Sequence, residues 1–139
     1  MIDTSIWTPR VLGILRIVTA LLLLEHVTMK FLEFPARSAR LPYPLPTIEV
    51  VAGNIEPVAG ALILVGQLTR VAAFIASGET AVAYFLVHLH LNFWPTLNQG
   101  EAAIFFSFIF LFLAIAGGGS WSLEHIRQIK FGVAERRSS

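Results

Sequence analysis

Ionisable side chains interrupt the long apolar runs of this chain, and they are of the types that move protons or hold polar groups. They are Glu25, His26, Lys30, Glu56, Glu79 and His88. Each costs about 3 kcal/mol or more at the centre of a membrane span unless it is paired, neutralised or hydrated. The carboxyls outnumber the cations at similar depth, which leaves one carboxyl in excess. Such a group is suited to proton transfer, so these residues are the first candidates for function.

Four apolar segments must position these side chains. They cover residues 11–33, 48–66, 71–91 and 102–119. About 20 apolar residues cross the hydrocarbon core of a bilayer, and Pro or Gly residues mark the segment ends, as Pro9 does before the first. We therefore expect an all-α chain, an integral membrane four-helix bundle that forms a single domain over residues 1–139, with a polar C-terminal tail at 124–139.

The composition agrees with a membrane protein and excludes several other classes. Hydrophobic residues make up 55% of the 139 residues and charged residues 14%, whereas soluble domains carry about 25% charged residues. This apolar content excludes a disordered chain. The absence of Cys excludes disulfides and Cys-based zinc or iron–sulfur sites. A net charge of +1 gives no basic surface for nucleic acid.

Basic residues divide unevenly between the two ends of the expected bundle. One end has Arg10, Arg70, Arg127, Lys130, Arg136 and Arg137. The other end has Arg37 and Arg40. Because Lys- and Arg-rich loops stay in the cytoplasm, we expect both termini to be cytoplasmic in a multi-pass protein of a bacterial-type cytoplasmic (inner) membrane. A cleaved signal peptide is the rival interpretation of the N-terminus, but no cleavage site follows the first apolar run.

Helical spacing brings several polar residues onto shared faces. A narrow stripe of the second span holds Glu49, Gly53, Glu56 and Gly60. Small residues in such a stripe let another helix approach closely. At about 100° per residue, His26 and Lys30 lie one turn apart on the first span, and His88 stacks on Tyr84 on the third.

The buried charges have two interpretations at this point. In the first, the acids pair with Lys30, Arg16 or a histidine and only hold the helices together. In the second, they line a partly hydrated pocket that opens outward and binds a polar head group or relays protons. A haem held by His26 and His88 is a further alternative. No spacing of residues indicates a metal site.

The polar positions occur in an order that resembles a known family. The residues that carry the resemblance are Arg16, Lys30, Glu56-Pro57-Val58-Ala59-Gly60, Gly66-Gln67-Leu68-Thr69-Arg70, Ala73, Glu79, Ala83-Tyr84-Phe85, His88, Phe93-Trp94-Pro95, Asn98, Gly100-Glu101, Gly117, Gly119 and Trp121-Ser122-Leu123. In this order they resemble the DoxX family of small four-helix membrane proteins over nearly the whole chain.

The resemblance implies a link to quinol oxidation. We expect a quinone- or quinol-interacting subunit of a membrane redox system, an oxidoreductase component with no visible redox centre of its own. Whether the chain is itself an enzyme stays open, and no catalytic residue is assigned. No cofactor is evident apart from the quinone. The expected partners are the lipid bilayer, a soluble or membrane redox protein and a second copy of the chain.

The expected site combines the ionisable residues of the apolar spans with the polar positions that carry the family resemblance. The ligand-binding candidates are Glu25, His26, Lys30, Glu56, Glu79, Tyr84, His88 and Trp94. Arg16 and Arg70 are expected to be structural polar residues. Two alternatives to a redox role are a non-enzymatic binder or transporter of a small amphipathic solute or lipid, and an assembly subunit.

Overall fold

The computed structural model describes residues 3–36 and 47–138 of the chain. Arg37 and Arg40 lie outside the described residues, as do the side chains of Glu49 and of residues 131–138. Every regular element in the described part is a helix, which confirms the predicted all-α class. The elements are α1 (Thr4–Phe31), α2 (Thr47–Val65), α3 (Thr69–Ala83), the π-helix η1 (Tyr84–His88), α4 (Pro95–Asn98), α5 (Glu101–Ala116) and α6 (Leu123–Ser138).

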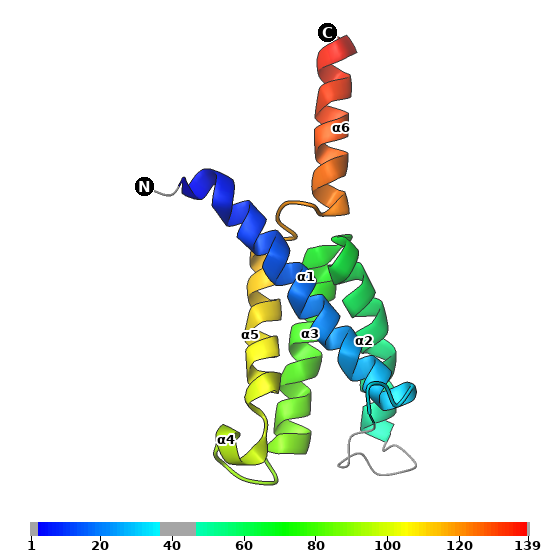
Figure 1. The fold of residues 1–139 in the computed structure, drawn as a ribbon, viewed down its shortest axis with the longest axis vertical. Coiled ribbons are helices and arrows are strands. Elements are labelled where there is room, and N and C mark those ends of the chain that lie inside the picture. The colour runs from blue at the N-terminus through cyan, green and yellow to red at the C-terminus, as the bar shows by residue number, and fades with distance from the viewer. Residues whose placement is uncertain (1–2, 37–46, 139) are drawn as a thin grey trace.

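Four long helices pack together and position the site. Helix α3 packs against both α5 and α2, and α1 crosses in front of them and packs mainly on α2 (Figure 1). Of these four helices, those that follow one another in the chain run in opposite directions (Figure 1). The start of α1, the end of α5 and the whole of α6 therefore lie at one end of the molecule, while η1 and α4 lie at the other (Figure 1).

The first helix begins earlier than the sequence predicts. Pro9 was expected to precede it, but α1 starts at Thr4 and includes Pro9. The cause is the N-cap Asp3, whose carboxylate accepts hydrogen bonds of 3.0 Å from the Ser5 backbone N–H and 2.6 Å from the Ser5 hydroxyl. A capped start stabilises the first turn, and a proline near the start of a helix removes few intrahelical hydrogen bonds.

The core consists mainly of small side chains. Its buried members are Ala20, Leu23, Ala59, Ile63, Ala72, Ala73, Ala76, Phe110 and Leu113. Alanines on α3 allow neighbouring backbones to come close, which is typical of helices that pack within a bilayer. The large apolar side chains point outward instead: Phe105, Phe108 and Ile115 of α5 are each about two-thirds exposed or more. The surface of the packed helices is therefore apolar.

Two helical stretches are long and apolar enough to cross a membrane by length and composition. They are Thr4–Phe31 and Thr69–His88, the second of which joins α3 to η1. Val50–Val65 and Glu101–Ala116 are apolar but shorter. Helix α6 differs from all of these, because it is polar and extends away from the packed helices (Figure 1).

Candidate functional site

A cavity of about 420 Å³ lies where α1, α2 and α3 come together, with contributions from η1 and α5. Its polar lining residues are His26, Lys30, Glu56, Glu79 and Thr80. The other lining residues are aliphatic, aromatic or glycine. We call it the Glu56 cavity. Its volume and its small number of polar groups in an apolar wall are typical of small-molecule binding sites, which measure about 300–1,000 Å³.

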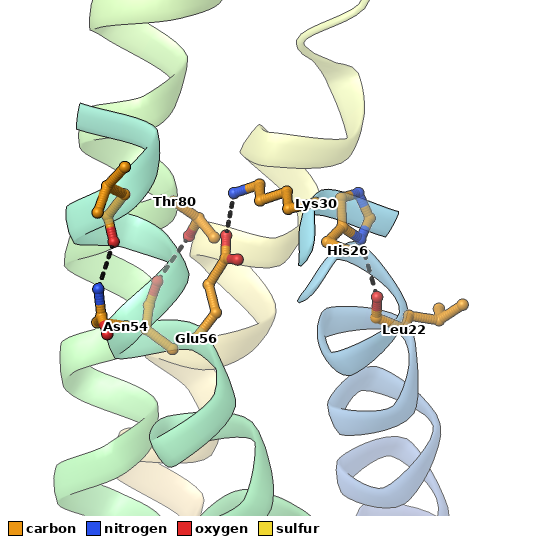
Figure 2. Close-up of polar contacts among 8 residues, drawn as sticks. Leu22, His26, Lys30, Asn54, Glu56 and Thr80 are labelled. Atoms are coloured by element: carbon orange, nitrogen blue, oxygen red, sulfur yellow. Dashed lines mark hydrogen bonds and ion pairs between the residues drawn. The ribbon is translucent and has the colours of Figure 1, made fainter. Parts of the chain in front are cut away.

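An ion pair between α1 and α2 forms the polar centre of this cavity. Lys30 Nζ donates to Glu56 Oε1 at 2.8 Å, and the two side chains are only 10% and 6% exposed (Figure 2). Lys30 lies in the last turn of α1, where a cation also interacts favourably with the negative end of the helix dipole. The pair is of the kind expected if the buried charges only hold the helices together. It also lies in the wall of a cavity, as expected if they line a pocket.

The second carboxylate oxygen of Glu56 is a polar atom of the cavity wall that lacks a hydrogen bond in the described part of the chain. Glu56 Oε2 is buried and has no hydrogen-bond partner among the described residues. Buried carboxylate oxygens are normally hydrogen-bonded, because leaving one unpaired costs about 1–3 kcal/mol or more. A donor that enters the Glu56 cavity would remove this cost. The site is thus prepared for a ligand that donates to Glu56 and accepts from Lys30.

His26 adds a directed acceptor to the same cavity. Its Nδ1 lies 2.8 Å from the carbonyl oxygen of Leu22, one turn earlier in α1 (Figure 2). A carbonyl only accepts, so Nδ1 carries the hydrogen, and in the neutral ring Nε2 is left as the acceptor. The His26 ring also contacts Phe106 edge-on, with the ring centroids 5.7 Å apart. These two contacts hold the imidazole in one orientation.

Helix α3 supplies an open wall. Thr80 donates its hydroxyl hydrogen to the Ala76 carbonyl at 2.8 Å (Figure 2), while Glu79 lines the cavity from the neighbouring position. Gly78 also lines the cavity, and a Cβ added there would meet no atom within 4 Å. Sequence reasoning missed Gly78, although a glycine inside a helical pattern often has a packing or functional reason.

The structure does not bring all of the sequence-predicted ligand residues together. His26, Lys30, Glu56 and Glu79 line the Glu56 cavity. Glu25 is exposed on α1 and lies outside its lining. The remaining three candidates gather around η1 and α4, away from the lining: they are Tyr84, His88 and Trp94.

The corner around η1 has its own network of contacts. Tyr84 stacks on His88 with the ring centroids 6.4 Å apart, as the helical spacing predicts. His88 Nδ1 lies 3.1 Å from the Asn98 carbonyl oxygen. The fully buried Asn98 side chain donates to the Asn92 carbonyl at 2.8 Å and accepts from the Gly100 N–H at 2.7 Å. All of these partners lie within the corner, so its contacts are those of a structural turn.

A π-turn explains why Tyr84 and His88 face this corner. The Leu89 N–H donates to the Tyr84 carbonyl at 3.0 Å, one residue further back than in an α-helix. One extra residue in a turn rotates every later side chain by about 100° relative to a continuous α-helix. Val87 lines the Glu56 cavity, while His88 contacts the Asn98 carbonyl at the end of α4.

Arg16 is buried at the opposite end of the molecule and binds only main-chain carbonyls in the described structure. It is 0% exposed. Its Nε donates to the Gly118 oxygen at 2.8 Å, Nη1 to the Ile63 oxygen at 2.6 Å and to the Leu64 oxygen, and Nη2 to the Trp121 oxygen at 3.3 Å. The last carbonyls of a helix lack intrahelical donors, and a guanidinium carries five. Arg16 thus caps α2 and ties it to the loop after α5.

Two other residues complete this end of the molecule. The loop after α5 approaches α2 closely at Gly66, where a Cβ would lie 2.4 Å from Ser122 Cβ. Gly66 also has a φ of +71°, a conformation that side-chain-bearing residues rarely adopt. Arg70 is exposed at the start of α3, and its guanidinium lies beside Gly117. The basic residue and the glycines therefore belong to the helix connections.

Comparison with known proteins identifies the family. The DoxX family model matches residues 11–89, which is more than half of the chain. An uncharacterized protein of Haemophilus influenzae is 39% identical over 126 residues, which cover 86% of this chain and 92% of that protein. No solved structure matches the chain significantly. The resemblance found in the polar positions is thereby confirmed, and the chain belongs to the DoxX family.

Proposed function

We propose that the protein is an integral membrane protein whose packed helices cross a bacterial cytoplasmic membrane, with both termini in the cytoplasm. The apolar surface and the two helical stretches of spanning length support this placement. The exposed Arg10, Arg70 and Arg127 belong to the end at which α1 and α6 begin (Figure 1), as the preference of basic residues for the cytoplasm requires. Helix α5 has 16 residues and is about 24 Å long at 1.5 Å per residue, so the bilayer thins locally around it.

We further propose that the Glu56 cavity binds the head group of a quinone or quinol. The observation that carries this proposal is the buried Glu56 carboxylate, which Lys30 engages at one oxygen while the other oxygen has no hydrogen-bond partner among the described residues. A quinone carbonyl accepts a hydrogen bond from Lys30. A quinol hydroxyl donates to Glu56 Oε2 or to His26 Nε2. One cavity thus recognises both redox forms of the same ring.

The apolar walls favour a ligand that arrives from the membrane. Phe74, Ile75 and Val82 line the Glu56 cavity and are also exposed on the outer surface of α3, by 66%, 48% and 48%. In a bilayer these side chains face lipid, so a lipid-soluble ring reaches Glu56 without crossing water. Electrons enter or leave through a separate redox protein in this proposal, while Glu56 and Glu79 accept or return the protons.

Equilibrium binding to the purified protein tests the proposal. The protein is reconstituted in phosphatidylethanolamine–phosphatidylglycerol nanodiscs and titrated with a benzoquinone and with its quinol. Glu56→Gln is expected to weaken quinol binding about tenfold or more, since a hydrogen bond to a charged group contributes about 1.5–3 kcal/mol. Gly78→Leu is expected to abolish binding of both forms, because it fills the cavity without touching the ion pair.

Glu25→Gln is the matched control, since it removes the same charge from an exposed position outside the cavity lining. It is expected to bind both ligands like the wild type. Equal affinity of the wild type, Glu56→Gln and Gly78→Leu would rule out the Glu56 cavity as the quinone site.

A non-redox amphipathic lipid or solute is the second candidate ligand. The same pair of groups, a Lys30 donor and a Glu56 acceptor in an apolar wall, supports it. Native mass spectrometry separates the two candidates: a co-purified quinone supports the redox role, whereas a phospholipid or a solute retained by the wild type and lost from Gly78→Leu supports the binder.

A further inference from the structure

A second cavity continues from the Glu56 cavity along the surface between α2 and α3. It measures about 320 Å³ and is lined by Asn54, Ile55, Val58, Ala59, Leu62, Leu68, Val71, Ala72 and Ile75. We call it the α2/α3 groove. Ile55 and Ile75 line both spaces, so the groove begins where the Glu56 cavity ends. From there it runs toward the connection between α2 and α3.

The chemistry of the groove differs sharply from that of the cavity. Among the described residues, Asn54 is the only polar one that lines it, and its amide donates to the Val50 carbonyl of its own helix at 2.7 Å (Figure 2). No charged side chain in the described part of the chain lines it. A polar head group would lose its hydrogen bonds with water there and gain none in exchange. The groove therefore suits a hydrocarbon chain.

We propose that the α2/α3 groove holds the hydrophobic tail of the ligand whose head group occupies the Glu56 cavity. This inference rests on the function proposed for that cavity. Along α3 the groove extends from Leu68 to Ile75, a distance of about 10 Å at 1.5 Å per residue. A tail attached to a ring beside Glu56 passes between Ile55 and Ile75 to enter it. The occupant is thus a quinone with a long isoprenoid tail rather than a short-tailed ring.

The outer edge of the groove explains how such a tail enters. Val58 and Val71 are 62% and 59% exposed, so the groove is open on its lipid side. Its inner wall is closed by Ala59 and Ala72, which are almost fully buried. A tail enters sideways from the bilayer and needs no opening of the helices. Because lipid chains are as apolar as the groove, the tail adds selectivity through fit more than through transfer from water.

Quinones with long and with single-isoprene tails separate the roles of the two spaces. Val58→Trp places a larger ring in the groove at its open edge, away from the buried inner wall, so the helix packing is expected to stay intact. It is expected to weaken binding of the long-tailed quinone about tenfold, an effect of about 1.4 kcal/mol, and to leave the short-tailed quinone unchanged. Ile115→Trp is the control, because Ile115 is 71% exposed on α5 and lines neither space.

The outcomes distinguish the two proposals. If Val58→Trp affects both quinones equally, or neither, while Gly78→Leu still abolishes binding, the tail groove is wrong and the head-group site stands. If Gly78→Leu has no effect on either quinone, the function proposed for the Glu56 cavity fails. Melting temperatures of all variants in nanodiscs show whether each remains folded, and Val71→Trp repeats the test from the opposite wall of the groove.

Discussion

The Lys30 ammonium and the Glu56 carboxylate lie 2.8 Å apart across the interface between α1 and α2, and both are almost fully buried. Removal of one partner from such a pair leaves a charge without compensation. Lys30→Met is therefore expected to lower the free energy of unfolding by about 3–5 kcal/mol. The double variant Lys30→Met/Glu56→Gln should regain most of this loss, because neither charge remains. Thermal unfolding of the four proteins in one detergent measures the coupling, and strictly additive losses would contradict it.

Arg16 is predicted to contribute more to the stability of the folded protein than any exposed cation does. Arg16→Leu leaves the Leu64 and Gly118 carbonyls without this donor, and an unsatisfied buried group costs about 1–3 kcal/mol, whereas the Ile63 carbonyl keeps the Gly66 N–H at 3.1 Å. Arg16→Lys should recover only part of the stability, because a lysine is a point charge without the planar array of donors.

Hydrogen exchange of the backbone amides locates the effect of the Arg16 variants. The amides of residues 119–126 should exchange faster, since the loop after α5 loses its attachment to α2. Arg10→Leu is the control: Arg10 is exposed and stacks on Trp7 at 5.6 Å, a contact that contributes about 0.5–1 kcal/mol. Unchanged exchange in residues 119–126 of Arg16→Leu would show that the carbonyl contacts do not hold the loop.

Two helical glycines are predicted to respond in opposite ways to the same substitution. Gly78→Ala adds a methyl group in open space and should stabilise α3 by about 0.5–1 kcal/mol. Gly13→Ala places a Cβ 2.5 Å from the Ser120 carbonyl oxygen, a main-chain atom that cannot move aside easily. It should destabilise the protein, since overpacking costs about 1–3 kcal/mol. Melting temperatures that shift in the same direction would contradict this contrast.

Asn98 is predicted to hold the corner between η1 and α5. Asn98→Ala removes an acceptor for the Gly100 N–H and a donor for the Asn92 carbonyl, and should cost about 2–4 kcal/mol. Asn98→Asp keeps the acceptor, and it should cost less than Asn98→Ala only at a pH where its carboxyl is protonated, because the ionised form places a buried charge against the Asn92 carbonyl oxygen. Unfolding measured by tryptophan fluorescence compares the two, because Trp94 lies at the N-cap of α4.

The helices could be predicted because the length of each apolar run, and the Pro and Gly residues that bound it, can be read directly from the sequence. The second segment, expected at 48–66, is α2 at Thr47–Val65, and the fourth, expected at 102–119, overlaps α5 at Glu101–Ala116, which starts one residue earlier and ends three residues earlier. Depth counting places the acids and imidazoles of three helices at similar depth, with Lys30 further toward the outer face, and leaves the Lys30–Glu56 pair as one of several possible pairings. Both predictions need only the helical rise and the position of the apolar runs.

The direction of side chains around η1, the partners of Arg16 and the start of α1 could not be predicted, because they depend on the conformation and hydrogen bonds of the main chain. The π-turn after Ala83 changes the direction of Tyr84 and His88 relative to Glu79, and no residue type announces it. Pairing rules based on charge assign Arg16 a carboxylate partner, whereas its hydrogen bonds go to carbonyls that every residue possesses. The early start of α1 depends on the local cap at Asp3, which outweighs the proline that follows.

The partners of Arg16 have a consequence for how this protein can evolve. A contact between two side chains forces the partner to change when one changes, and that leaves a correlated pair of positions among homologues. The Arg16 guanidinium contacts the main chain of Ile63, Leu64 and Trp121, so this contact by itself places no requirement on the side chains at those positions. The link that Arg16 makes between α2 and the loop after α5 would therefore leave no correlated pair, and among its members only Arg16 itself would be invariant.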